Sequence, residues 1–248
     1  MRRILETLVP AAPLILLFVV WESAARLGWA PPNLLPAPSL VLQRLLELLP
    51  DGEFLHHLGQ TLIRLLGGFA IALVVGVSLG LLASRTGGGA LITVVRVLAP
   101  IPKIALYPAF VLIFGYDHAS KIALVVADTL FPILLATFHG ARAVEPKLLW
   151  SAWAAGSGRF ASLFTVTLPA TLPAILTGCR VALLIACVTV FLAEMISSTD
   201  GLGHLLSLAA RSFRMVDMFV PLLLISLIGL LLNVALQFAR KHLLRGQS

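Results

Sequence analysis

The sequence has few charged residues for its length. Only 12% of its 248 residues are Asp, Glu, Lys or Arg, whereas a soluble domain carries about 25%. So few charges cannot cover a globular fold of this size, but a lipid bilayer requires no charged surface. Because 59% of the residues are apolar, the composition excludes an ordinary soluble domain and predicts a membrane protein.

Cysteine is scarce, and the usual catalytic motifs are missing. Cys179 and Cys187 lie eight positions apart in one apolar stretch, which predicts two small buried residues rather than a disulfide. No lysine follows the glycines at 87–89, so the chain lacks the loop that holds ATP phosphates. Ser157, between Gly156 and Gly158, does not lie in a Gly-x-Ser-x-Gly turn, and the histidines are scattered. We therefore expect no catalytic residues, no metal site and no enzyme.

Apolar runs of about 20 residues, long enough to cross a bilayer as helices, occur six times. The predicted spans cover about 8–27, 61–83, 90–114, 119–138, 172–196 and 219–239. No small-residue cleavage site closes the first run, so it is interpreted as a retained anchor rather than a signal peptide. The third run contains Pro100, Pro102 and Pro108 and is a candidate for a broken helix.

The expected fold is all-α, with two parts. Residues 1–60 form an anchor helix and an extracellular segment, in which Ser39 is a candidate N-cap for a short amphipathic helix ending near Leu49. Residues 61–248 form a core of five spans. In the second span, small residues recur at Gly67, Gly68, Ala72, Gly76 and Gly80, a pattern that favours close helix packing within the chain or with a second copy.

Basic residues predict the orientation. A net charge of +7 could indicate nucleic-acid binding in a soluble protein, but here the basic residues lie in short loops between spans. The side richer in Lys and Arg is assigned to the cytoplasm. This assignment places both termini and residues 142–171 inside the cell, and residues 29–60 and 197–217 outside. No nucleic-acid partner is expected.

The polar interruption at about 142–171 is the most informative segment. Gly156, Ser157 and Gly158 separate two short helical stretches, because glycine readily adopts the left-handed conformation that ends a helix. Pro169 and Pro173 are expected to break the second stretch before the fifth span. Its apolar side chains are too many for a loop that faces only water, and they include Phe160, Leu163, Phe164 and Val166.

Ionisable residues inside the spans are costly unless they are paired or hydrated. Lys103, Tyr107, Asp128 and Glu194 are therefore candidates for a translocation path. The alternative is that such groups pair with one another or reach a membrane surface, which we prefer for Arg96 and Arg180. For Glu194, a gate or a fold-stabilising pair is preferred over solute binding.

The ordered motifs resemble the permeases of ABC importers over about residues 14–240. Gly156 with Leu168-Pro169, Leu172-Pro173 and Gly178 resembles their cytoplasmic signature loop. That loop begins Glu-Ala-Ala in the family, whereas this chain has Trp150, Ser151 and Ala152. Further motifs resemble the branch that imports sulfonates, taurine and nitrate: Leu35-Pro36-Ala37-Pro38-Ser39, Pro102-Lys103-Ile104-Ala105-Leu106 with Pro108 and Phe114-Gly115, Phe131-Pro132 with Thr137-Phe138-His139-Gly140, and Ala193-Glu194-Met195 with Gly201-Leu202-Gly203.

The resemblance implies a permease in the bacterial inner membrane that binds no cofactor itself. Two copies would line one path for a small solute, surrounded by lipid, and two ATPase subunits would use ATP and Mg. A periplasmic or lipid-anchored binding protein would deliver the solute. The ATPase-coupling loop would comprise Ala152, Gly156, Ser157, Gly158, Phe160, Leu163, Phe164, Leu168 and Pro169.

The sequence leaves the identity of the solute open, and one other class of function, a secondary transporter, stays an alternative. A small anion such as a sulfonate, taurine or nitrate is favoured, and Lys103 or Arg180 could offset its charge. A heterocyclic vitamin precursor or another small organic solute is the alternative. A secondary transporter without an ATPase would predict an inverted repeat, and none is evident between residues 1–120 and 121–248.

Overall fold

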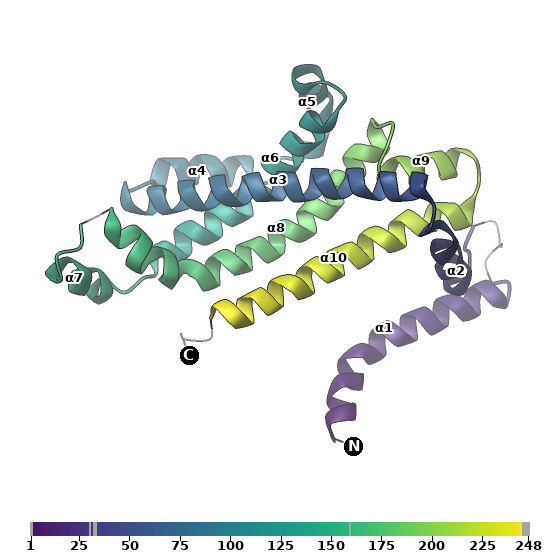
Figure 1. The fold of residues 1–248 in the computed structure, drawn as a ribbon, viewed down its shortest axis with the longest axis horizontal. Coiled ribbons are helices and arrows are strands. Elements are labelled where there is room, and N and C mark those ends of the chain that lie inside the picture. Colours follow the sequence, from purple (N-terminus) through teal and green to yellow (C-terminus); the bar gives the residue numbers. More distant parts are fainter. Residues whose placement is uncertain (1, 30, 32–33, 159, 245–248) are drawn as a thin grey trace.

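The chain folds into helices throughout the part that the structure describes (Figure 1). This computed structural model describes residues 2–29, 31, 34–158 and 160–244, with the backbone alone for residues 2–11 and 14. The α-helices are α1 (Arg2–Arg26), α2 (Pro38–Leu48), α3 (Gly52–Arg85), α4 (Gly89–Leu98), α5 (Tyr107–Phe114), α6 (His118–Arg142), α7 (Pro146–Ala154), α8 (Leu168–Ile196), α9 (Leu202–Arg211) and α10 (Met215–Leu243). A 3-10 turn, η1 (Lys103–Leu106), precedes α5, and a π-helical turn, η2 (Leu163–Thr167), precedes α8.

Four helices in the described part are long and apolar enough to cross a membrane: α3, α6, the continuous helix Leu163–Ile196, and α10. The predicted third span is broken, as its prolines suggested. Its two halves, α4 and Lys103–Phe114, meet at 82° and count as one further span if taken together. Pro102 lies directly at this break, as the N-cap of η1, and proline cannot supply the N–H that a continuous helix needs.

The predicted first span falls almost entirely within α1. Figure 1 shows α1 leaning away from the bundle and joining it near α2. At this junction the Trp21 ring lies 5.7 Å from the Phe219 ring of α10, and its Nε1 donates to the Pro36 carbonyl at 3.1 Å. Since the side chains of α1 are described only from Ala12 on, a total of six spans stays a prediction.

The core of the bundle lies where α3, α6 and α8 pack together. A Cβ atom on Gly76 would meet Ile133 of α6 at 3.0 Å, and one on Gly80 would lie 2.7 Å from Thr137. Gly178 of α8 lies equally close to α6 from the other side, near Ala136. The small residues of the second span therefore pack closely against α6 of the same chain, which confirms the packing prediction.

Two expectations about helix ends were wrong. Pro169 and Pro173 do not break the chain, because α8 continues through both. Pro169 follows directly on the π-helical turn η2, where the backbone hydrogen-bond pattern already departs from that of an α-helix, and Pro173 removes only one further hydrogen bond. Ser39 is not the N-cap of α2 either, because Ala37 holds that position with Pro38 following it. The Ser39 hydroxyl instead donates to Glu22 at 2.7 Å.

Candidate functional site

A helical elbow projects from one end of the bundle. The elbow comprises α7, the described residues 155–158 and 160–162, and η2, and Figure 1 shows α7 at the end opposite α9. Gly156 has φ +84°. The Gly156 N–H donates to the Trp153 carbonyl at 3.0 Å, and the Ser157 N–H donates to the Ala152 carbonyl at 2.9 Å. This pair of bonds is the Schellman motif, so the helix ends at the predicted glycine.

The elbow exposes aromatic side chains. Phe160 is 70% exposed and Trp150 61% exposed, and Phe164 and Trp153 are exposed as well. Leu163 is buried, and Arg85 at the end of α3 donates to the Thr167 hydroxyl at 2.7 Å. The elbow is thus attached to the bundle through η2 while its aromatic face stays uncovered.

The remaining predicted residues of the loop lie on or beside this face. Gly156, Gly158 and Pro169 are exposed, and Ala152, Ser157 and Leu168 are half-buried. A Cβ atom on Gly156 or Gly158 would meet nothing within 4 Å. The structure therefore brings the predicted loop residues together in one surface feature.

Two of the four candidate path residues form an ion pair at the break between α4 and η1. Lys103 Nζ lies 3.4 Å from the Asp128 carboxylate and donates to the Ala99 carbonyl at 3.0 Å. It also lies 4.9 Å from the centre of the Phe131 ring. The Thr189 hydroxyl donates to Asp128 at 2.5 Å. Lys103 is therefore paired inside the chain, as the alternative interpretation expected, and is not a free cation.

The other ionisable residues of the spans are spread over the molecule. Arg96 Nη2 lies 3.3 Å from His139 Nε2, and Arg180 is exposed on α8. Tyr107 is buried, and its hydroxyl donates to the Ser197 carbonyl at 3.1 Å. The structure thus does not collect the four candidate path residues into one site, and their role in transport stays a prediction.

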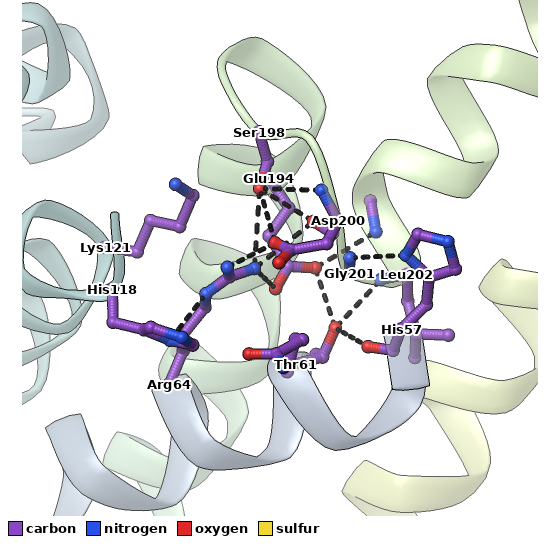
Figure 2. Close-up of polar contacts among 12 residues, drawn as sticks. His57, Thr61, Arg64, His118, Lys121, Glu194, Ser198, Asp200, Gly201 and Leu202 are labelled. Atoms are coloured by element: carbon purple, nitrogen blue, oxygen red, sulfur yellow. Dashed lines mark hydrogen bonds and ion pairs between the residues drawn. The ribbon is translucent and has the colours of Figure 1, made fainter. Parts of the chain in front are cut away.

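Glu194 lies in a buried polar cluster near α9 (Figure 2). We call this group the latch: His57, Thr61, Arg64, Glu194, Asp200 and the backbone of residues 201–203. Arg64 donates to the Glu194 carboxylate at 2.8 Å and also pairs with Asp200. The Thr61 hydroxyl donates to the second oxygen of Glu194 at 2.8 Å. Glu194 is only 1% exposed and is paired inside the chain; its role as a gate or as a fold-stabilising pair stays a prediction.

The latch also accounts for the first backbone donors of α9. Helix N-termini leave their first N–H groups without partners inside the helix. Here the Gly201 N–H donates to His57 Nδ1 at 3.0 Å, the Leu202 N–H to Thr61 Oγ1 at 2.8 Å and the Gly203 N–H to Glu194 at 3.1 Å. Side chains of α3 and α8 therefore cap α9 and hold it in place.

Glycine is required at residue 201. Its φ is +100° with ψ 168°, a region that side chains rarely adopt. A Cβ atom there would also overlap the Glu194 carboxylate. The Gly201-Leu202-Gly203 motif thus lets the chain pass directly over a buried carboxylate.

Asp200 is the partly exposed member of the latch. Burial alone would raise its pKa, but the hydrogen bond and the charge of Arg64 hold the pKa below its ordinary value. Asp200 therefore stays ionised and keeps Arg64 paired on two sides.

Most of the latch was missed by sequence reasoning. Only Glu194 and the glycine motif were singled out. A signal was available, because Arg64 stands as a charge inside an apolar run, and such residues are costly without a partner. His57, Thr61 and Arg64 also follow helical spacing, which puts them on one face.

Known proteins resemble this chain over most of its length. Residues 57–248 match the family described as binding-protein-dependent transport system inner membrane component. SsuC of Escherichia coli strain K12, named for the transport of aliphatic sulfonates, is 36% identical over 91% of this chain and 87% of that protein. The formylaminopyrimidine transport permease protein ThiX of Halalkalibacterium halodurans is 32% identical over 93% and 92%. The taurine transport system permease protein TauC of Escherichia coli strain K12 is 30% identical over 93% and 86%.

A solved structure shares the fold. The structure of inward-facing conformations of the MetNI methionine ABC transporter matches with a TM-score of 0.58 and 20% identity, over 83% of this chain and 99% of that one. The all-α membrane fold, the ordered motifs and the sequence relatives agree. The chain therefore belongs to the family of binding-protein-dependent transport system inner membrane components, the permease subunits of ABC importers.

Proposed function

We propose that this permease imports a small organic anion of the aliphatic sulfonate class, as a homodimer driven by two ATPase subunits. The sulfonate and taurine relatives support the solute class. A solute-binding protein outside the membrane would deliver the solute at the α9 end. ATP and Mg would be bound by the ATPase subunits, and both termini of this chain would lie in the cytoplasm.

The exposed aromatic face of the elbow carries the coupling proposal. Trp150 and Phe160 lie on a structured helix–turn–helix that is uncovered in the single chain. Exposed aromatic residues in a cluster are typical of a protein interface. The ATPase subunit is the partner that an importer must receive on its cytoplasmic side, so the elbow would dock there.

The continuous helix behind the elbow would transmit the movement. It runs for 34 residues from Leu163 to Ile196, a length of about 51 Å at 1.5 Å per residue. One end begins at the elbow and the other ends beside Glu194 of the latch. A shift of the elbow would therefore reach the α9 end through one rigid element rather than through loops.

Substitution of one elbow aromatic tests the coupling. We expect Phe160→Ser to weaken ATPase binding by about thirtyfold or more, since buried interface aromatics contribute about 2 kcal/mol or more. Phe213→Ser is the matched control, because Phe213 is 83% exposed in the turn between α9 and α10. Affinity between the detergent-solubilised permease and the purified ATPase is measured together with ATP-driven uptake in proteoliposomes.

Equal affinity and uptake for the wild type and Phe160→Ser would refute docking at the elbow. Uptake of solute by the permease alone, without an ATPase, would instead favour a secondary transporter.

A heterocyclic solute is the second candidate, because the formylaminopyrimidine permease is about as similar as the sulfonate ones. Competition decides between them. If the sulfonate proposal holds, excess aliphatic sulfonate blocks the uptake of solute by the complete transporter, whereas excess formylaminopyrimidine does not block it.

A further inference from the structure

A polar pocket at the α9 end has no role in the function proposed so far. Its volume is about 380 Å³, within the range of small-molecule sites. The turn before α6, the end of α8 and one side of α9 surround it. The polar residues that line it and matter here are Asp117, Ser197, Thr199, His204, Ser207 and Arg211.

Buried side chains hold the walls of this pocket in place. Lys121 donates to the Tyr116 carbonyl at 2.5 Å, and Tyr107 donates to the Ser197 carbonyl at 3.1 Å. The Ser207 hydroxyl ties α9 to the backbone at the end of α8, at 3.1 Å. The latch fixes the start of α9 next to it. The pocket is therefore preorganised, which reduces the entropic cost of binding.

The pocket contains one cation and one anion that are both free to meet a ligand. Among the described residues, no ion pair includes Arg211 or Asp117, and both are exposed. The neighbouring charges Arg64, Glu194 and Asp200 pair with one another inside the latch, and the buried Lys121 donates to the backbone carbonyls of Tyr116 and Asp117. The Thr199 hydroxyl, which is also exposed, is available as a neutral donor.

Opposite charges in one small pocket match a small zwitterion. A guanidinium can bind two oxygens of a sulfonate at once, and a carboxylate accepts hydrogen bonds from an ammonium group. We propose that this pocket receives an aminosulfonate, with Arg211 holding the sulfonate and Asp117 the ammonium group. This inference rests on the proposed import of sulfonates and narrows it to zwitterionic members of the class.

A pair of solutes that differ in one group tests the assignment. Taurine and isethionate share the sulfonate and the two-carbon chain, but isethionate has a hydroxyl in place of the ammonium. Uptake of each is measured in proteoliposomes that contain the complete transporter and its binding protein. We expect Arg211→Gln to lower uptake of both solutes by about tenfold, the effect of losing a charge-assisted hydrogen bond. Asp117→Asn should lower taurine uptake by about tenfold and leave isethionate uptake within twofold.

Matched variants guard against a general effect of surface charge or of misfolding. Arg214→Gln removes a nearby arginine that pairs with Asp217 outside the pocket and should change neither uptake by more than twofold. Arg211→Lys should recover part of the lost uptake, and melting temperatures identify any variant that fails to fold.

Equal effects of Asp117→Asn on both solutes, or no effect of Arg211→Gln, would overturn the pocket proposal while sulfonate import stands. A wild-type transporter that imports isethionate but not taurine would do the same. A wild-type transporter that imports neither solute would overturn this inference, and one that imports no aliphatic sulfonate at all would refute the proposed function as well.

Discussion

At the scale of single residues, the guanidinium of Arg64 connects α3 with three other parts of the chain. It belongs to α3, pairs with Glu194 of α8 and with Asp200 of the segment before α9, and lies 3.3 Å from His118 Nδ1 at the start of α6. Burying two opposite charges is costly unless their remaining hydrogen bonds are made. In the latch these hydrogen bonds are made, because the Thr61 hydroxyl and the Gly203 N–H also donate to the Glu194 carboxylate.

Glu194→Gln tests how far the latch stabilises the fold. Arg64, Thr61 and Gly203 all donate to Glu194, so an amide must direct its NH₂ group at a donor. We expect a loss of about 3 kcal/mol in the free energy of unfolding, the usual cost of breaking a buried ion pair on one side. Thermal unfolding of the detergent-solubilised protein measures it.

The control for Glu194→Gln is the exposed pair of Glu47 with Arg44. Glu47→Gln should cost about 0.5 kcal/mol or less. If both variants melt at the same temperature, Glu194 is not a stabilising residue, and a direct role in transport becomes the better interpretation.

At the scale of elements, Gly156 and Gly158 both follow the end of α7 and look alike in the sequence, but they differ in backbone conformation. Neither has an atom within 4 Å of its missing Cβ, but only Gly156 has a positive φ. The space around them is therefore equal, and only the backbone conformation differs.

Gly156→Ala should consequently loosen α7, whereas Gly158→Ala should not. An alanine in the left-handed conformation costs roughly 1 kcal/mol. This cost corresponds to about a fivefold larger population of the opened helix end, and hence to about fivefold faster amide exchange there. Hydrogen exchange of the backbone amides of 146–158 measures this directly. Equal exchange in the two variants would mean that the Schellman turn does not hold the elbow together.

The same elements show what the sequence could predict. Long apolar runs, the break at the prolines of the third span and the glycine end of α7 were predictable, because each follows from one local rule. The continuation of α8 through Pro169 and Pro173 was not predictable, since it depends on where the helix starts. The side-chain partners of Glu194, Thr61 and Arg64, were not predictable either, because they lie more than 100 positions away in the chain.

At the scale of the whole molecule, α8 is the most buried of the apolar helices and yet has one exposed stripe. Among the candidate spans of the described part, it has the largest buried share. The stripe nevertheless exposes Val181, Leu184 and Val188, together with Arg180. An arginine that faces lipid inside a span is costly, so this stripe fits a second protein surface or a hydrated path better than lipid.

A groove of about 510 Å³ between α8 and α10 runs along this stripe. It includes Asn233, whose side-chain oxygen is buried and has no hydrogen-bond partner among the described residues. The groove thus continues the exposed stripe of α8. We expect the second copy of the proposed homodimer to pack against both.

Cysteine cross-linking tests this placement of the second copy. With Cys179 and Cys187 replaced by alanine, Leu184→Cys should form covalent dimers in native membranes when a short bis-maleimide is added, because Leu184 lies in the groove and is 53% exposed. Leu231→Cys is the control, because Leu231 of α10 is 67% exposed but lies outside the groove, where lipid should surround it. Dimers from Leu231→Cys and none from Leu184→Cys would place the second copy against α10 instead, and the stripe on α8 would then have to face a water-filled path within one chain.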